Sequence, residues 1–181
     1  MGTRVLLCDL QLEIKATDAL TAEEHAYIAS WMRQVWGSTD AANYKWSESD
    51  WHIVGRIDGK PVTHVEIVER IGTVNGQPVK LGGIGGVTTL PEWRRCGFAS
   101  TALQRAATFM REELRVEFGL LICEREMVPL YRRLWWEIAD APLVFEQSSG
   151  KTSFPEAVAM VLPCSGKEFP RGVIDLCGLP W

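Results

Sequence analysis

Hydrophobic and polar residues alternate with the period of a strand in some segments of the chain and with that of a helix in others. Alternation over Gln11–Ala16 predicts a first strand. A helical period follows, and Thr21 and Glu24 stand at its start with the spacing of a capping box. We expect this helix to end at Gly37. Its apolar face consists of Tyr27, Ile28, Trp31, Met32, Val35 and Trp36.

Three strands joined by two tight turns are predicted in the middle of the chain. Trp51–Ile57 and Pro61–Arg70 flank Asp58-Gly59, which is a favourable hairpin dipeptide. Asn75-Gly76 is a second dipeptide of this kind and leads into Val79–Leu90.

The third of these strands ends at Pro91, because proline has no N–H for a sheet ladder. A helical pattern then begins, with Ala99, Leu103, Ala106 and Met110 on its apolar face. Hairpins followed by a strand–helix–strand crossover predict a mixed α/β (α+β) sheet in a single domain over residues 1–181. The later elements are strands at Phe118–Cys123, Trp136–Ala139, Leu143–Phe145 and Val158–Leu162 and a short helix at Met127–Leu134.

Between Pro91 and the helix lies a turn suited to an anion. The first N–H groups of a helix lack partners, and the peptide dipoles place about half a positive charge there. Phosphate binds at such ends, Gly97 permits close approach, and Arg94 and Arg95 add positive charge. The glycines at 82–86 are followed by more strand residues and the turn has no lysine, so neither a dinucleotide fingerprint nor a Walker loop is present.

The composition is that of an ordinary globular protein, with 46% hydrophobic and 23% charged residues among 181. A net charge of -4 argues against a nucleic-acid surface and suits a cationic substrate. Five cysteines and three histidines lack disulfide or metal-ligand spacing, so we expect reduced thiols, no metal site and a cytoplasmic location. The run Val5–Cys8 is too short for a signal-peptide core, and no apolar stretch reaches membrane-spanning length.

Arg94-x-x-Gly97-x-Ala99 resembles the pattern Gln/Arg-x-x-Gly-x-Gly/Ala of the GNAT acetyltransferase superfamily, and the order of elements resembles the GNAT fold over nearly the whole chain. The resemblance implies a mostly antiparallel twisted sheet flanked by helices, with acetyl-CoA as cofactor. It also implies that N–H groups of the turn hold the pyrophosphate, and that those of Val87 and Thr89 polarise the thioester and hold the pantetheine arm. The residues expected at the coenzyme are Val87, Thr88, Thr89, Arg94, Arg95, Cys96, Gly97, Phe98, Ala99 and Ser100.

Three segments resemble aminoglycoside 2′-N-acetyltransferases more closely. Residues 86–94 are similar to the corresponding turn of that family. Residues 130–136 resemble its Leu-Tyr-x-x-x-Gly-Trp segment, with Trp135 where the family has glycine. Val161–Pro163 and the final Trp181 resemble its C-terminal pattern. The resemblance implies direct transfer of acetyl to an aminoglycoside amine in a ternary complex, and hence antibiotic resistance.

Acetyl transfer to an amine needs a base for the amine and an acid for the leaving thiolate. Tyr131 resembles the tyrosine that acts as general acid in GNAT enzymes, although a packed core tyrosine is the alternative. The chain departs from the resembling family at the base, because Gly85 stands where that family has a glutamate.

Hairpin geometry suggests a replacement base. If Asn75-Gly76 is a two-residue turn, Val74 faces Gln77 and, eight positions further, Glu66 faces Gly85. Opposed residues project to the same face of a sheet, so Glu66 would occupy the room that the glycine leaves. His64 would share that face. The alternative for Glu66 is a solvated strand residue.

A polycationic substrate favours carboxylates and aromatic rings around its site. The polar segment 38–50 is expected to form a loop or a short helix beside this site, and its Glu48 and Asp50 are further carboxylates there. The α-carboxylate of Trp181 is another group that could pair with a substrate amine. We expect no nucleic-acid or membrane partner, and a homodimer is left open. The candidate substrate residues are Asp40, Trp46, Gly85, Gly86, Glu156 and Trp181.

Two other functions remain open at this stage. The same machinery would serve an N-acyltransferase of another amino sugar or of a polyamine. A GNAT-like module that binds acyl-CoA without catalysis is the second alternative, and the missing family glutamate favours it.

Overall fold

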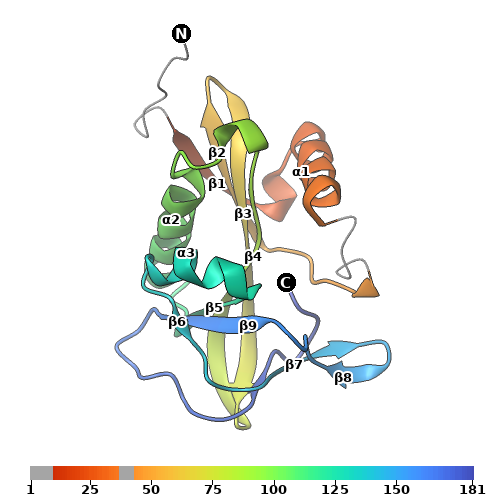
Figure 1. The fold of residues 1–181 in the computed structure, drawn as a ribbon, viewed down its shortest axis with the longest axis vertical. Coiled ribbons are helices and arrows are strands. Elements are labelled where there is room, and N and C mark those ends of the chain that lie inside the picture. The colour runs from red at the N-terminus through yellow and green to blue at the C-terminus, as the bar shows by residue number, and fades with distance from the viewer. Residues whose placement is uncertain (1–9, 37–42) are drawn as a thin grey trace.

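The computed structural model describes residues 10–36 and 43–181. Gly37, Asp40 and the run Val5–Cys8 lie outside the described residues, as do the side chains of Met32, Val35 and Trp36. Figure 1 shows the chain as a central long hairpin crossed by shorter elements. The helices are α1 (Ala22–Trp36), α2 (Phe98–Glu112) and α3 (Val128–Arg132). The strands are β1 (Gln11–Ala16), β2 (Trp51–Ile57), β3 (Lys60–Val74), β4 (Gln77–Thr89), β5 (Phe118–Cys123), β6 (Glu137–Ile138), β7 (Leu143–Gln147), β8 (Gly150–Thr152), β9 (Val158–Pro163) and β10 (Ile174–Asp175).

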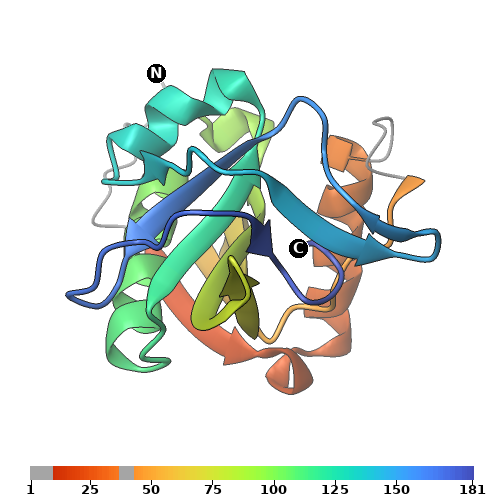
Figure 2. The same ribbon diagram turned by 90° about the horizontal axis from the view of Figure 1, so that it is seen from below.

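The strands form a mixed and mostly antiparallel sheet. Its order is β6-β9-β5-β4-β3-β10-β7-β8, with β2 also beside β3 and β1 beside β2. β4 and β5 run parallel, whereas β2–β3, β3–β4 and β5–β9 are antiparallel. Helices α1 and α2 lie on opposite faces of the sheet (Figures 1 and 2). The predicted fold class, a mostly antiparallel sheet flanked by helices, is confirmed.

Local chemistry sets the ends of the first helix and the turns of the hairpins. Thr21 accepts from the Glu24 N–H at 3.2 Å and its own N–H donates to the Glu24 carboxylate at 2.9 Å, so the predicted capping box is present. Asp58-Gly59 and Asn75-Gly76 both have positive φ angles, as the tight turns of hairpins require.

The register of the central hairpin follows from its second turn. Val74 lies opposite Gln77, and the count continues without a shift to Glu66 opposite Gly85, which confirms the predicted pairing. A bulge follows, because the next pair is His64 with Thr88. Gly86 lies in this bulge with φ 55.

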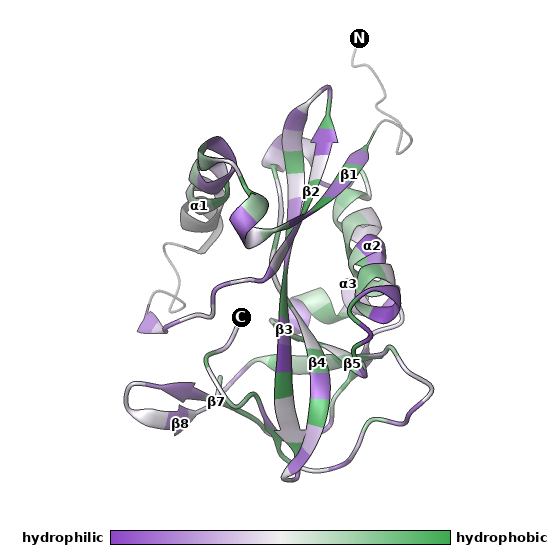
Figure 3. Cartoon of the chain, turned by 180° about the vertical axis from the view of Figure 1, so that it is seen from behind, coloured by the Kyte–Doolittle hydropathy of each residue, from purple (hydrophilic) through white to green (hydrophobic). Residues whose placement is uncertain are grey.

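The core is divided between the two faces of the sheet. Toward α2, Val65, Ile67 and Ile84 pack with buried residues of that helix. Toward the other face, Val68 and Leu81 pack with Trp181 and residues of β5, β7 and β10. This division follows the period of two along β3 and β4, whose colours alternate along the hairpin in Figure 3.

Several boundaries differ from the sequence predictions. β3 extends to Val74, beyond the predicted Arg70, because its pairing with β4 continues to the turn, and β10 pairs with its last two residues. Gly72 interrupts the apolar pattern there, since a Cβ at this position would lie 2.8 Å from the Asp175 carbonyl oxygen. The predicted helix at 127–134 is a short 3-10 turn followed by α3, which ends at Arg132. The sequence predicted neither β8, which pairs with β7, nor β10, which pairs with β3 and β7.

Candidate active site

β4 and β5 diverge at the point where the coenzyme motif begins. They pair from Leu81 with Phe118 to Ile84 with Leu121. Beyond that point β5 remains paired with β9, while the last five residues of β4, 85–89, have no partner on the β5 side within the described chain. Backbone groups of Val87 to Thr89 therefore face an opening rather than a neighbouring strand.

The start of α2 lies after this opening and has the predicted form of an anion site. Gly97 is the N-cap residue with φ 85, a left-handed conformation that favours glycine. The first helical bond runs from the Thr101 N–H to the Gly97 carbonyl at 3.0 Å. The N–H groups of Phe98, Ala99 and Ser100 come before that bond, and they are the unpaired donors of a helix N-terminus.

Side chains fix the loop around these donors. Phe98 is buried and anchors the helix start in a small cluster with Ile57 and Val62. The Arg94 Nε donates to the Thr89 carbonyl at 3.2 Å, which ties the loop to the end of β4. Arg95 and Cys96 are exposed beside it. The arrangement fits a diphosphate, because unpaired N–H donors stand at the helix start and the exposed loop before it carries Arg94 and Arg95.

Tyr131 lies in α3, in the core cluster between α2 and the sheet, and is buried. Burial, together with the nearby Cys123 thiol at the end of β5, raises the pKa of Tyr131. The hydroxyl therefore keeps its proton at neutral pH, as a general acid must. The position of Cys123 places Tyr131 near the end of the opening between β4 and β5.

Glu66 lies beside the bulge of β4, on the face of the sheet opposite to α2. A Cβ built on Gly86 would lie 2.6 Å from the Glu66 Cδ, so the carboxyl fills the space left by that glycine. We expected Gly85 to leave the space for the Glu66 side chain. In the structure Gly86 leaves that space, because the bulge turns Gly86 toward Glu66. Burial raises the pKa of Glu66, and a hydrogen bond from the Ser49 side chain lowers it.

Trp181 covers the neighbouring stretch of β4. A Cβ on Gly83 would meet its indole at 2.0 Å, and a Cβ on Gly85 would lie 3.0 Å from its carbonyl carbon. The Trp181 Nε1 donates to the Leu120 carbonyl at 3.3 Å. A glutamate at position 85 would therefore have to displace the main chain of Trp181, which gives a steric reason for glycine here.

Two buried histidines adjoin Glu66 on the same face. The His52 Nδ1 lies 2.9 Å from the His64 Nε2, and the His52 Nε2 lies 3.0 Å from the Thr17 Oγ1. One ligand-type atom of each histidine and of Glu66 lie within 4.8 Å of one another. Burial lowers the pKa of His52 to about 4 and that of His64 to about 3.

Two imidazoles and a carboxylate are also a common ligand set for a metal ion. The ring centroids of His52 and His64 are 5.2 Å apart and the rings are inclined by 15°. This distance equals the 2.9 Å between the two nitrogens plus the radii of the two rings. The two nitrogens therefore lie on the line that joins the ring centroids. Their lone pairs point at each other and not at a common third position. The pair fits a shared proton and does not fit a metal chelate.

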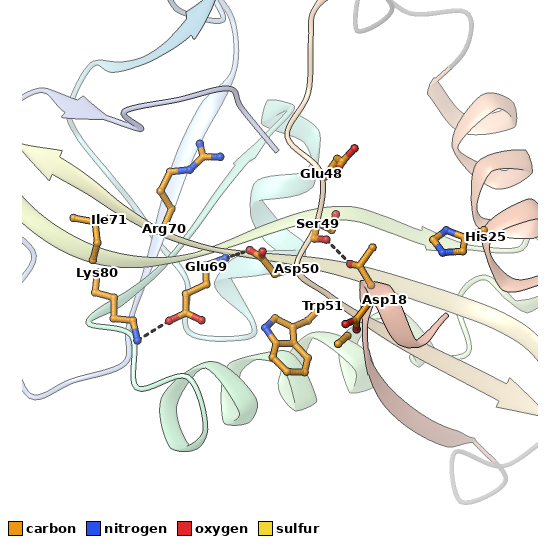
Figure 4. A pocket seen from close by; sticks show the side chains of 12 residues that line it. Asp18, His25, Glu48, Ser49, Asp50, Trp51, Glu69, Arg70, Ile71 and Lys80 are labelled. Atoms are coloured by element: carbon orange, nitrogen blue, oxygen red, sulfur yellow. Dashed lines mark hydrogen bonds and ion pairs between the residues drawn. The ribbon is translucent and has the colours of Figure 1, made fainter. Parts of the chain in front are cut away.

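An open hollow of about 930 Å³ lies beside the group formed by His52, His64 and Glu66. Figure 4 shows its lining along the segment that enters β2 and the neighbouring part of β3. Ser49, which bonds Glu66, lines one side, and Arg70, which lies 5.3 Å from the Trp181 ring, lines another. Its carboxylates outnumber its lysine and arginine side chains. The former are Asp18, Glu48, Asp50 and Glu69, and the latter are Arg70 and Lys80.

The positive groups of the hollow are held by neighbours. Lys80 pairs with Glu69 at 2.6 Å. Arg70 donates to the Leu179 carbonyl at 2.5 Å and to the Ser47 hydroxyl. Asp50 accepts from the Glu69 N–H at 2.7 Å and so covers the open edge of β3.

The structure brings some of the predicted substrate residues together. Trp46 is partly exposed and stacks on Phe154 with ring centroids 5.6 Å apart, and Glu156 is exposed two residues further on. The Ser47 N–H donates to the Pro180 carbonyl at 2.7 Å, which places this segment beside Trp181. Asp40 lies outside the described residues.

Sequence reasoning missed His52 and Thr17 as neighbours of Glu66. The pairing of β2 with β3 places His52 directly opposite Glu66, whereas a count through the Asp58-Gly59 turn would have placed it opposite Val65. A bulge in β2 between Gly55 and Arg56 shifts that count. Thr17, in the turn after β1, has no such signal. Among the described residues, no helix is long and apolar enough to cross a membrane.

A protein-family model described as an acetyltransferase (GNAT) domain matches residues 16–139 of the chain. None of the curated proteins compared with the chain matches it.

Solved structures share the fold at low sequence identity. The GNAT family N-acetyltransferase YhbS from Escherichia coli, in complex with CoA, is 14% identical, with a TM-score of 0.64 over 94% of this chain and 96% of that one. A GNAT family acetyltransferase from Brucella melitensis, in complex with acetyl-CoA, is 13% identical, with a TM-score of 0.59 over 91% and 94%. ElaA from Escherichia coli is 12% identical, with a TM-score of 0.61 over 84% and 98%.

Proposed function

Since the chain belongs to the GNAT acetyltransferase family, whose members are acyl-CoA-dependent N-acetyltransferases, we propose that it transfers acetyl from acetyl-CoA to an amine of an aminoglycoside. The observation that carries the proposal is the arrangement at the bulge of β4. The opening toward β5 and the start of α2 lie after the bulge, and the half-buried carboxyl of Glu66, a residue of β3, lies against Gly86 on the other face of the sheet.

Each residue has a role that its position supports. The N–H groups at 98–100 and the Arg94 guanidinium bind the pyrophosphate, and the backbone at 87–89 orients the thioester. Glu66 accepts a proton from the substrate ammonium, and Tyr131 donates one to the leaving thiolate. With acetyl-CoA bound, the amine nitrogen bonds to the carbonyl carbon and the C–S bond breaks.

The acidic hollow supports a polycationic acceptor. It has a volume of about 930 Å³, within the range of roughly 300–1,000 Å³ typical of small-molecule sites. Asp18 and Glu48 line it, and the ring of Trp46 lies in the segment that leads to it. Carboxylates and indole faces bind ammonium groups by charge and by cation–π contact. The homodimer remains a proposal that light scattering would test.

The experiment measures thiol release from acetyl-CoA with a panel of aminoglycosides, and with other amino sugars and polyamines as competing acceptor classes. NMR of the product then assigns the acetylated nitrogen. We expect turnover with aminoglycosides. Turnover with polyamines and with no aminoglycoside would show that the acceptor is a polyamine and not an aminoglycoside. Coenzyme binding by calorimetry without turnover for any amine would show a binding module and contradict the enzyme proposal.

A further inference from the structure

A row of polar groups runs across the sheet from the bulge of β4 to the edge of the hollow. His64 has a hydrogen bond with the backbone of Gly86 that acts to raise its pKa, so the bond is donated to a carbonyl oxygen. His64 then faces His52 at 2.9 Å, and His52 faces Thr17 at 3.0 Å. The Thr17 hydroxyl donates to the carbonyl of Ser49, which lines the hollow.

Counting protons along this row gives an unusual result. Both ends are carbonyl oxygens, which only accept, so the row has four hydrogen bonds and needs four protons. Thr17 supplies one, and each neutral imidazole supplies one, which makes three. The row is therefore complete when it carries one extra proton and is one proton short when both rings are neutral.

Burial keeps the row neutral at rest. It lowers the pKa of His64 to about 3, and the neighbouring His52 lowers it further. Burial likewise lowers the pKa of His52 to about 4; His25 of α1 adds to this and Glu24 of α1 opposes it. The relay starts from the tautomers in which each neutral ring holds its proton on Nε2 and donates toward Thr17, whose own proton is directed to Ser49. The Nδ1 of His64 is then left without a proton, at the end of the row beside Gly86.

That position is also where Glu66 lies. Its carboxyl fills the space over Gly86, and one of its oxygens lies within 4.8 Å of one ring nitrogen of each histidine, a span that a single water bridges with two hydrogen bonds. Thr88, directly opposite His64 and 95% buried, directs a hydroxyl to the same face, and within the described residues this hydroxyl has no hydrogen-bond partner. A carboxylate, an imidazole and a hydroxyl are the two to four polar partners that a buried water needs.

We infer that His64, His52 and Thr17 form a proton relay that takes the acceptor amine's proton from Glu66 and releases it into the hollow. This inference rests on the proposed function. The amine proton moves to the Glu66 carboxylate, and a proton then passes through the bridging water to His64. His64 passes its Nε2 proton to His52. His52 passes its own Nε2 proton to the Thr17 hydroxyl, whose proton goes to water in the hollow. Glu66 is left ionised and no proton is lost or gained. Each ring now holds its proton on Nδ1, so both rings must return to the Nε2 tautomer before the next turnover.

The first test uses kcat/KM against pH for His52→Gln and His64→Gln, with the matched pair Thr17→Val and Thr73→Val. Thr17 belongs to the relay, whereas Thr73 lies on β3 at the pair with β10. We expect the two histidine variants to lose about tenfold or more at neutral pH and to recover at alkaline pH, where the amine is already deprotonated. Thr17→Val should show a smaller loss of the same form, and Thr73→Val none. Coenzyme affinity by calorimetry should stay unchanged in all four.

The second test needs no substrate. Nitrogen-15 NMR of the histidine rings in the coenzyme-free protein should show a proton shared between His52 and His64 and both rings neutral below the ordinary histidine pKa of about 6.5. The relay is overturned if both rings titrate near that value without a shared proton, or if His52→Gln and His64→Gln keep the full rate at neutral pH. If the wild-type protein acetylates no amine, the proposed function fails instead, and the NMR result then decides the hydrogen-bonded row alone.

Discussion

The two faces of the β4 bulge are built in different ways. On the coenzyme side, the groups are mostly backbone N–H donors from one continuous stretch, 87–100. On the base side, the groups are side chains from β2, β3, the turn after β1 and the end of the chain: His52, His64, Glu66, Thr17 and Trp181. A site made of backbone groups can therefore be predicted from a local motif. A site made of side chains from several strands depends on the strand register.

The sharpest way to separate acid from base is to remove the hydroxyl of Tyr131. Tyr131→Phe keeps the packed ring and should lower turnover by ~10²–10⁴, the usual effect of losing a general acid. Coenzyme affinity should change little. Steady-state kinetics and calorimetry measure the two effects. A turnover number within about twofold of wild type would assign Tyr131 to packing alone.

The backbone side is best broken at Gly97. Gly97→Val places a branched side chain at φ 85 in the position that a diphosphate must approach, so acetyl-CoA affinity should fall at least about tenfold. Gly59→Val is the control, since Gly59 also has a positive φ but stands in the open hairpin turn between β2 and β3. Calorimetry on proteins shown to be folded by circular dichroism gives the result. Equal acetyl-CoA affinity in Gly97→Val and Gly59→Val would contradict the assignment of the anion site to the start of α2.

The base side should make stability depend on pH. The folded-state pKa values of His52 and His64, about 4 and about 3, lie below the ordinary 6.5. The unfolded chain therefore binds more protons between pH 6.5 and those values, so the free energy of unfolding falls as pH falls through this window. Urea unfolding at several pH values measures the slope.

The double variant His52→Gln with His64→Gln is the comparison for that measurement. It should lose less stability on acidification than the wild-type protein, because the groups that take up protons on unfolding are gone. An identical slope in both proteins would show that other groups cause the acid sensitivity.

The smallest expected effect concerns Trp135, outside both faces of the bulge. Its side chain is 83% exposed and its φ is 68, a conformation that suits glycine after a helix end. Trp135→Gly should raise the free energy of unfolding by ~1 kcal/mol, the strain of a non-glycine residue in this region less the entropy cost of glycine. Denaturant unfolding measures it, and activity should be unchanged. A destabilised variant would indicate that the indole makes a contact that outweighs the strain.

Most of the fold could be predicted because its signals are local. The dipeptides Asp58-Gly59 and Asn75-Gly76 fix two hairpins, and the second fixes the register as far as Glu66. The bulge at Gly86 could not be predicted, since two adjacent glycines allow it at either position. β10 and the place of Trp181 depend on contacts with β3, β5 and β7 that are distant in the sequence.

Acetyl transfer with Glu66 as base is the central claim, and the pH–rate profile of Glu66→Gln tests it most directly. The amide keeps the shape of the side chain but accepts no proton, so kcat/KM at neutral pH should fall by ~10² or more and rise again as the substrate amine deprotonates. Glu137→Gln, in exposed β6, should match the wild-type protein at every pH. A near-normal rate for Glu66→Gln at neutral pH would contradict the claim.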